Sequence, residues 1–243
     1  MRVRIANLTD QRDLEIVRAL RDGNPAYVRL KQTMEALFQG KRCVVIGSAP
    51  VIEEVDRRDG DINICVNGSF HNAERLGVVD ADAHFLVNYI FTQGNRAART
   101  VYKMLQGRHF ETCVVYSGTL SFAASVAGLR EAGATYGSIH DISTHERAAL
   151  TGDVCGIELG VGKLEDRVSN GVTTAICALW AGAREVHLAG FSLAGGHSYT
   201  KFKSRRYHTR PDATFFALCK ERRLPLTSAS PELRERFGIP ARI

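Results

Sequence analysis

Cys43-Val-Val-Ile-Gly-Ser-Ala-Pro50 is the stretch that decides the fold, because it joins a short apolar run to a turn of small residues. A run of β-branched residues that ends in Gly and Ser is typical of a buried strand in a parallel sheet. Similar runs recur along the chain, separated by stretches with helical periodicity. The predicted strands cover residues 42–46, 62–66, 84–87, 112–116 and 185–189, with a last one near Leu226. This alternation predicts an open α/β sheet, mostly parallel, with helices on both faces.

Helical periodicity predicts further elements around this sheet. Helices are expected over residues 95–105, 120–131, 172–182 and 212–222, and the residues after Pro50 are expected to open another. Before the first strand, residues 14–20 and 27–38 have helical spacing and are separated by a break at Asp22 to Pro25. We therefore divide the chain into an N-terminal helical extension, residues 1–40, and a larger domain, residues 41–243.

The composition is that of an ordinary globular protein. With 243 residues, 44% of them apolar and 24% charged, the chain can bury a core, which excludes disordered and low-complexity classes. The N-terminus lacks the apolar core of a signal peptide and no apolar run is long enough for a membrane span, so we expect a cytoplasmic protein. The net charge of +6 fits an anionic ligand or a membrane surface, but it is too small to indicate nucleic acid. The six cysteines have no zinc-binding spacing, so neither a metal site nor disulfides are expected.

Polar residues stand at the ends of the first three predicted strands, where Ser48, Asn67 and Asn88 occur. Because ligands bind outside the carboxyl ends of the strands in an open α/β sheet, we expect these side chains to converge on one crevice. Asn donates and accepts hydrogen bonds, which suits nucleobase edges and sugar hydroxyls, although a single Asn is also a common turn residue.

A second motif, Arg167-Val-Ser-Asn-Gly-Val172, runs into an apolar helix. In one interpretation Ser169 or Asn170 simply caps a core helix. In the other, Arg167 lies beside the helix N-terminus and binds a carboxylate or phosphate. The sequence alone leaves both open.

Residues 191–210 have no clear periodicity and follow a strand, where a lid over the crevice would lie. This segment contains Tyr199, Tyr207 and His208 together with five Lys or Arg residues. Such a lid could close over an anionic substrate and supply a base, and a solvated basic loop is the alternative.

Four other enzyme classes fit less well. Gly190-Phe-Ser192-Leu-Ala approximates a nucleophile elbow, but no acid lies between Ser192 and His208 and no His follows His208, which disfavours a serine hydrolase. The first turn has neither the GxGxxG spacing of NAD enzymes nor a P-loop. A Mg²⁺-dependent pyrophosphate transfer would need carboxylates at the strand ends, and none cluster there.

Taken in order, these motifs resemble the bacterial sialyltransferases of glycosyltransferase family 42, the group of the Campylobacter and Haemophilus lipooligosaccharide sialyltransferases. The resemblance extends from about residue 41 to residue 231. Residues 47–52 correspond to the family's G-N-G-P-S-L turn, and Asn67 and Asn88 to the Asn residues after its next two strands. Residues 167–172 correspond to its R-[IV]-T-S-G-V segment, and Val186 to Gly190 to the strand and glycine that follow. Tyr199 and the segment His208-Thr-Arg-Pro-Asp212 complete the order.

The resemblance implies a Rossmann-like fold of the GT-A-variant type. It also implies a metal-independent, inverting transfer of sialic acid, or a related nonulosonic acid, from a CMP-sugar to an acceptor glycan, with no cofactor beyond that donor. His208 would be the general base, Tyr199 would contact the leaving phosphate, and Arg167 would orient the donor or acceptor. The nucleotide and sugar pocket would be lined by Gly47, Ser48, Ala49, Asn67, Gly68, Asn88, Ser169, Asn170, Gly171, Gly190, Phe191 and Tyr207.

The chain departs from the family pattern at two positions. Ser48 stands where the family has Asn, and Ala194 lies near the position of a second lid tyrosine, which Tyr207 or a basic residue of 201–206 could replace. A nucleotide-binding relative without transfer activity therefore stays an alternative. Because family members form oligomers and attach to membranes peripherally, we expect a homo-oligomer at the inner membrane surface and no nucleic-acid partner.

Overall fold

The computed structural model describes residues 11–156, 164–194, 196–200 and 207–241. Within this part of the chain, seven parallel strands form one sheet in the order β5-β4-β3-β2-β1-β6-β7. The chain winds outward from β1 to β5, then returns to place β6 beside β1, with Arg42 opposite Glu185 and Ile46 opposite Ala189. This is an α/β Rossmann-like fold, as predicted. The strands are β1 (Arg42–Ile46), β2 (Ile62–Val66), β3 (Ala83–Val87), β4 (His109–Tyr116), β5 (Thr135–Ile142), β6 (Glu185–Ala189) and β7 (Leu226–Ser228).

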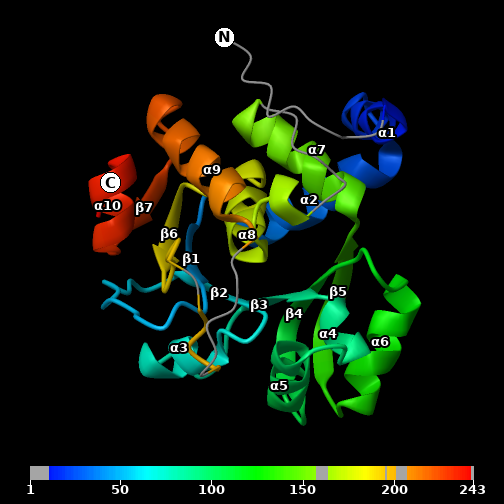
Figure 1. Cartoon of the computed structure of the whole chain (residues 1–243). Helices are drawn as coiled ribbons and strands as arrows, with labels where there is room; N and C mark the ends of the chain where they lie inside the picture. Colours follow the sequence, from blue (N-terminus) through cyan, green and yellow to red (C-terminus); the bar gives the residue numbers. More distant parts are fainter. Residues whose placement is uncertain (1–10, 157–163, 195, 201–206, 242–243) are drawn as a thin grey trace.

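Helices cover both faces of the sheet (Figure 1). One face carries α1 (Gln11–Arg21), α2 (Pro25–Phe38), α7 (Thr144–Cys155), α8 (Asn170–Trp180) and α9 (Thr209–Glu221). The other carries α3 (Phe70–Arg75), α4 (Tyr89–Thr92), α5 (Arg96–Leu105) and α6 (Phe122–Glu131). A short 3-10 helix (Leu164–Asp166) precedes α8, and α10 (Pro231–Phe237) follows β7. None of the described helices has the length and apolar character needed to cross a membrane.

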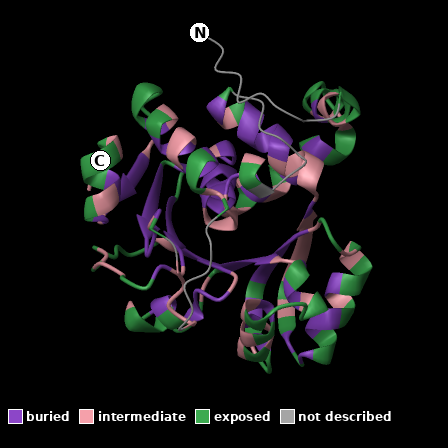
Figure 2. Cartoon of the chain, in the orientation of Figure 1, coloured by how far each residue is buried: buried purple, intermediate pink, exposed green. Residues whose placement is uncertain are grey.

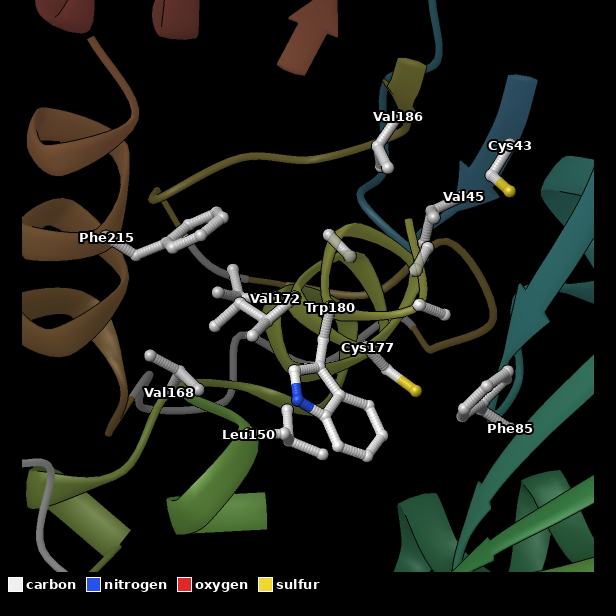
Figure 3. Packing of buried hydrophobic residues seen from close by; sticks show 14 of the residues in the cluster. Cys43, Val45, Phe85, Leu150, Val168, Val172, Cys177, Trp180, Val186 and Phe215 are labelled. Atoms are coloured by element: carbon white, nitrogen blue, oxygen red, sulfur yellow. The ribbon is translucent and has the colours of Figure 1, made fainter. Parts of the chain in front are cut away.

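The central helix of the core is α8, which is apolar almost all round, as a fully enclosed helix must be. Val172, Cys177 and Trp180 project from it into a cluster with Leu150 of α7 and Phe215 of α9 (Figure 3). The strands are buried along most of their length, and the exposed residues concentrate on the outer helices (Figure 2). At the start of α8, the Ser169 hydroxyl accepts a hydrogen bond from the Val172 N–H, so this cap fixes where the helix begins.

The N-terminal helical hairpin forms as its spacing predicts, and its side chains enter the same core cluster as α8. Asn24 caps α2 by accepting from the N–H groups of Ala26 and Tyr27. The Asp153 carboxylate of α7 joins the pieces, because Arg21 and Tyr27 of the hairpin and Trp180 of α8 all donate hydrogen bonds to it, at 2.6, 2.8 and 3.1 Å.

Some expectations about individual elements are wrong. Residues 51–58 form no helix after β1; their backbone is instead tied to buried charges, since Arg42 donates to the Asp56 carbonyl and the Arg58 N–H donates to Asp61. Helix α9 begins at Thr209 rather than at residue 212, with His208 at its N-cap position. Strand β5 and helix α7 are not predicted at all, because β5 is a half-exposed edge strand and α7 mixes polar and apolar residues.

Candidate active site

A cavity of about 350 Å³ lies at the carboxyl ends of the strands, where the chain order reverses between β1 and β6. Open α/β sheets bind their ligands at this switch point, and the volume lies in the range of about 300–1,000 Å³ usual for small-molecule sites. Six segments meet there: the turns after β1, β2 and β6, the N-terminal ends of α5 and α8, and the segment that precedes α9. Most of the predicted site residues line this cavity, namely Gly47, Ser48, Ala49, Asn67, Ser169, Asn170, Gly171, Gly190, Phe191, Tyr199, Tyr207 and His208.

Glycines allow the turns around the cavity to pack closely. A Cβ atom on Gly47 would lie 2.5 Å from the Gly190 carbonyl oxygen, and one on Gly171 would lie 2.9 Å from the Phe191 ring. Gly190 has a φ of +65°, which favours glycine over every other residue. The buried Asn72 of α3 secures the first turn by donating to the carbonyls of Gly47 and Ala49, at 2.9 Å each. Any larger residue at these glycines would therefore disrupt the floor of the site.

His208 stands at the N-cap position of α9 and lines the cavity. Its Nδ1 lies 2.8 Å from the Arg167 carbonyl oxygen. Because a carbonyl oxygen only accepts, Nδ1 carries the proton and the neutral ring keeps its lone pair on Nε2. The buried Asp212 fixes the same junction by accepting from the Ser169 N–H at 2.8 Å. Helix α9 thus holds the His208 imidazole against the N-terminal end of α8.

Tyr199 lies across the cavity wall, where its ring packs on Gly68 so closely that a Cβ there would lie 2.6 Å away. Burial raises the pKa of the Tyr199 hydroxyl to about 12, although its side-chain interaction with Ser48 acts in the opposite direction. The ring also stacks on His197, with 4.9 Å between ring centroids. The His197 Nδ1 is 2.8 Å from the Ser48 hydroxyl, and the Ser198 N–H donates to the Ser48 carbonyl at 2.7 Å. Ser48 thereby anchors residues 197–199 over the cavity.

Three of the predicted residues lie outside the cavity lining. Gly68 packs against the ring of Tyr199. Asn88 is buried and holds the loop after β4, because its amide donates to the Leu120 carbonyl and accepts from the Thr119 N–H. The Arg167 side chain lines a separate small space together with Arg147, and its backbone carbonyl accepts a hydrogen bond from His208. Asn88 and Arg167 are placed by contacts with segments that are distant in the sequence, so no local sequence pattern predicts their positions.

The patterns of the sequence do not indicate some other residues of the site. Asn95 and His197 line the cavity, and Arg147 contacts Asn170 from behind it. Asn95 carries a readable signal, because it caps α5 by accepting from the Ala98 N–H. The positions Lys201, Lys203, Arg205 and Arg206 lie outside the described residues, as does part of the predicted lid over 191–210.

The described lining of the cavity contains no Asp, Glu, Lys or Arg. Its hydrogen-bonding groups are hydroxyls, amides, two imidazoles and the N-terminal end of α8, whose first N–H groups have no partner inside the helix. Ser192 of the elbow-like sequence donates to Glu232 at 2.8 Å and is followed by irregular chain rather than a helix, so it lacks the setting of a nucleophile. In the part of the chain that the structure describes, no three His, Cys, Asp or Glu side chains form a metal-binding group. This chemistry suits an anionic ligand held by uncharged donors.

In sequence, the chain matches no protein-family profile and no curated protein. In structure, it is similar to the monofunctional alpha-2,3-sialyltransferase Cst-I from Campylobacter jejuni, with a TM-score of 0.51 and 11% identity over 82% of this chain and 80% of that one. It is also similar to a variant of the sialyltransferase Cst-II in complex with CMP, with a TM-score of 0.52 and 13% identity over 83% of this chain and 86% of that one. At this level of identity the likeness shows the fold, which is the GT-A-like fold of these sialyltransferases.

Proposed function

We propose that the protein is an inverting glycosyltransferase that moves sialic acid, or a related nonulosonic acid, from a CMP-sugar to a hydroxyl of an acceptor glycan. The observation that carries the proposal is the placement of His208, with its Nδ1 on the Arg167 carbonyl, in the cavity at the switch point and next to the N-terminal end of α8. The likeness in fold to Cst-I and Cst-II supports it. This pairing of base and anion-binding helix end suits the attack of a neutral hydroxyl on an anionic sugar.

In the proposed reaction, the acceptor oxygen attacks the anomeric carbon while Nε2 of His208 takes the hydroxyl proton. The bond between the anomeric carbon and the phosphate oxygen breaks, and CMP leaves with the electron pair. His208 then releases its proton to solvent. The hydrogen bond from Nδ1 to the Arg167 carbonyl keeps the ring oriented and stabilises the imidazolium form of His208.

The departing phosphate gains negative charge, so it needs hydrogen-bond donors. Tyr199 is the candidate for this role, because its burial keeps the hydroxyl protonated and able to donate at neutral pH. The N-terminal end of α8 adds the positive end of a helix dipole. Since no carboxylate lines the described part of the cavity, we propose that these donors act without a metal ion.

The test is a His208→Asn variant, whose side-chain amide can still donate to the Arg167 carbonyl but has no equivalent of Nε2. We expect sialic acid transfer from CMP-sialic acid to fall about 10²- to 10⁴-fold, with CMP affinity and melting temperature unchanged. His71→Asn, on the exposed surface of α3, is the matched control and should leave all three unchanged.

CMP binding to the wild-type protein in the absence of Mg²⁺ is measured first, by thermal shift and calorimetry. If CMP does not bind, but a purine nucleotide with Mg²⁺ does, the proposal is wrong and pyrophosphate transfer becomes the better interpretation. If CMP binds and the His208→Asn variant transfers sugar at the wild-type rate, His208 is not the base.

A further inference from the structure

Arg147 of α7 places a cation directly behind the cavity. Its Nη2 donates to the Asn170 Oδ1 at 3.0 Å and to the Thr173 Oγ1 at 3.1 Å, and its guanidinium lies 4.5 Å from the centre of the Tyr116 ring. Burial lowers the pKa of Arg147 to about 10, so the group stays charged at neutral pH. No carboxylate among the described residues forms an ion pair with it.

This contact decides which way the Asn170 side chain faces. A side-chain amide has one acceptor, its oxygen, and one donor group, its NH2. Because Arg147 can only donate, it holds the oxygen, and the NH2 group points to the other side of the amide. Asn170 lines the cavity, and its NH2 group is the part of the amide that Arg147 does not hold.

The cation also reinforces the first turn of α8. Thr173, the second acceptor of Arg147, in turn donates to the Ser169 carbonyl at 3.0 Å. The positive charge of Arg147 therefore adds to the positive end of the α8 dipole at Asn170 and Gly171. A group that sits at this end of the cavity meets donors and positive potential without any cation in the described lining.

The position of His208 indicates which part of the ligand would lie at the Asn170 end of the cavity. Its Nδ1 donates to the carbonyl of Arg167, three residues before Asn170, so the base and the donor-rich turn share one corner of the site. A base that deprotonates the acceptor must lie close to the anomeric carbon. In a nonulosonic acid that carbon carries the sugar's carboxylate directly, whereas in a neutral aldose it carries hydrogen.

We infer that Arg147 is a positioning residue that turns Asn170 into a donor for the carboxylate of the donor sugar, and so selects acidic over neutral sugars. This inference rests on the proposed function. The residue that sets sugar specificity then lies outside the cavity, on a helix that the motifs of the sequence do not include. The effect acts on the ligand only through Asn170 and through the charge behind α8.

The test compares the affinities of CMP and of the inert donor analogue CMP-3-fluoro-sialic acid, measured by calorimetry. For the wild type we expect the analogue to bind more tightly than CMP. Arg147→Met should weaken the analogue about tenfold or more, the loss expected for a charge-assisted hydrogen bond, and change CMP less than about twofold. Arg147→Lys, which keeps the charge, should recover part of the difference. Arg130→Met, on the exposed end of α6, is the matched control and should change neither affinity.

A second variant separates a loss of ligand binding from a loss of folding. Asn170→Asp still accepts from Arg147, so α8 stays anchored, but it faces the cavity with a carboxylate oxygen in place of the NH2 group. We expect it to lose affinity for the analogue and to keep its affinity for CMP. Equal effects of Arg147→Met on both ligands, or an Asn170→Asp variant with wild-type affinity for the analogue, would overturn the inference alone. A wild-type protein that binds neither ligand would overturn the proposed function and this inference with it.

Discussion

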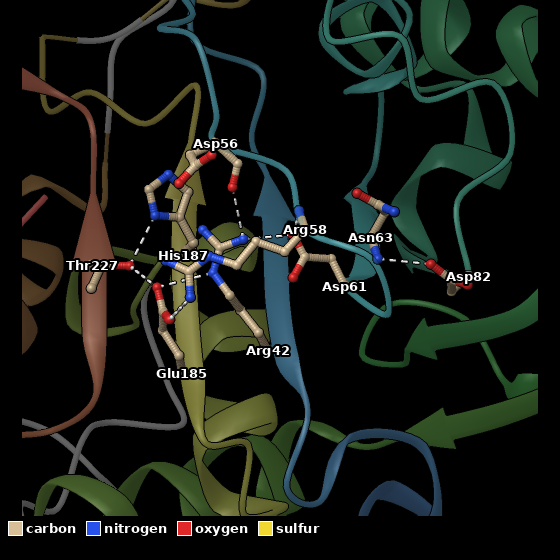
Figure 4. A network of polar contacts seen from close by, with 9 residues as sticks. All are labelled: Arg42, Asp56, Arg58, Asp61, Asn63, Asp82, Glu185, His187 and Thr227. Carbon is tan, nitrogen blue, oxygen red and sulfur yellow. Dashed lines mark hydrogen bonds and ion pairs between the residues drawn. The ribbon is translucent and has the colours of Figure 1, made fainter. Parts of the chain in front are cut away.

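The two ends of the central sheet use polar residues in opposite ways. At the amino end, Arg42 of β1 lies 2.5 Å from Asp61 and 3.0 Å from Glu185 of β6, with all three side chains no more than 7% exposed (Figure 4). Thr227 of β7 donates to Glu185 and is bonded to His187, at 2.9 and 2.8 Å. At the carboxyl end, the described lining of the cavity has no charged side chain.

The difference teaches that a dense cluster of buried charges is not by itself a functional site. The charges at the amino end pair with one another and join strands β1, β6 and β7 with the loop before β2. The carboxyl end instead keeps uncharged donors around open space. To bind an anion, a site needs hydrogen-bond donors without a partner in the protein more than it needs charged side chains. Such donors bind the anion without first losing a counterion.

The largest expected effect comes from breaking the amino-end network. Arg42→Met would leave Asp61 and Glu185 buried without their cation, which should lower the free energy of unfolding by about 3–5 kcal/mol. Urea unfolding measures this directly. A loss below about 1 kcal/mol would mean that water, rather than Arg42, satisfies the two carboxylates.

The second effect concerns two buried histidines, one near each end. Burial lowers the pKa of His187 and of His84 to about 4, and His84 donates from Nε2 to the Asn67 carbonyl. The unfolded chain binds protons on these rings below about pH 6.5, while the folded protein does not until about pH 4. Stability is therefore lost as the pH falls through this window, by about 2 kcal/mol for each ring at pH 5.

Urea unfolding at pH 7.5 and pH 5.0 measures that loss. His187→Gln should remove the part of this pH-dependent loss of stability that His187 causes. His84→Gln should remove the part that His84 causes. A loss between the two pH values that neither substitution reduces would show that other groups cause it.

The sequence predicts the parts of this comparison that depend on local pattern. Strands β1, β2 and β6 are predicted with the observed bounds, because each is a continuous apolar run, and the rule that ligands bind at the carboxyl ends brings Ser48 and Asn67 to one cavity. What the sequence does not predict depends on contacts between distant segments. Asn88 forms hydrogen bonds with a loop more than thirty residues away, and Arg147 of α7 donates a hydrogen bond to Asn170 of α8. The loop after β1 replaces a helix because Arg42 binds its backbone, a contact that no local pattern encodes.

Tyr199 offers a test of the carboxyl end. Tyr199→Phe removes the hydroxyl proposed to donate to the departing phosphate and should slow transfer about ten- to a hundredfold, since a hydrogen bond to a charged group contributes about 1.5–3 kcal/mol. Tyr207→Phe is the matched control, because Tyr207 lines the same cavity but is 44% exposed, and its effect should be smaller. The reverse order of effects would assign the leaving phosphate to Tyr207.

The smallest effect is expected for Arg58, the outermost member of the amino-end network. Its Nη1 lies 3.5 Å from Glu185, and its side chain is 38% exposed, so water and salt screen the pair. Arg58→Ala should lower the free energy of unfolding by less than about 1 kcal/mol, and 0.5 M NaCl should erase most of that difference. Because Arg42 and Arg58 share the acceptor Glu185, the two substitutions compare a buried and an exposed cation on one carboxylate. Losses of equal size would show that exposure does not set the strength of these pairs, and the contrast between the two ends of the sheet would then need another cause.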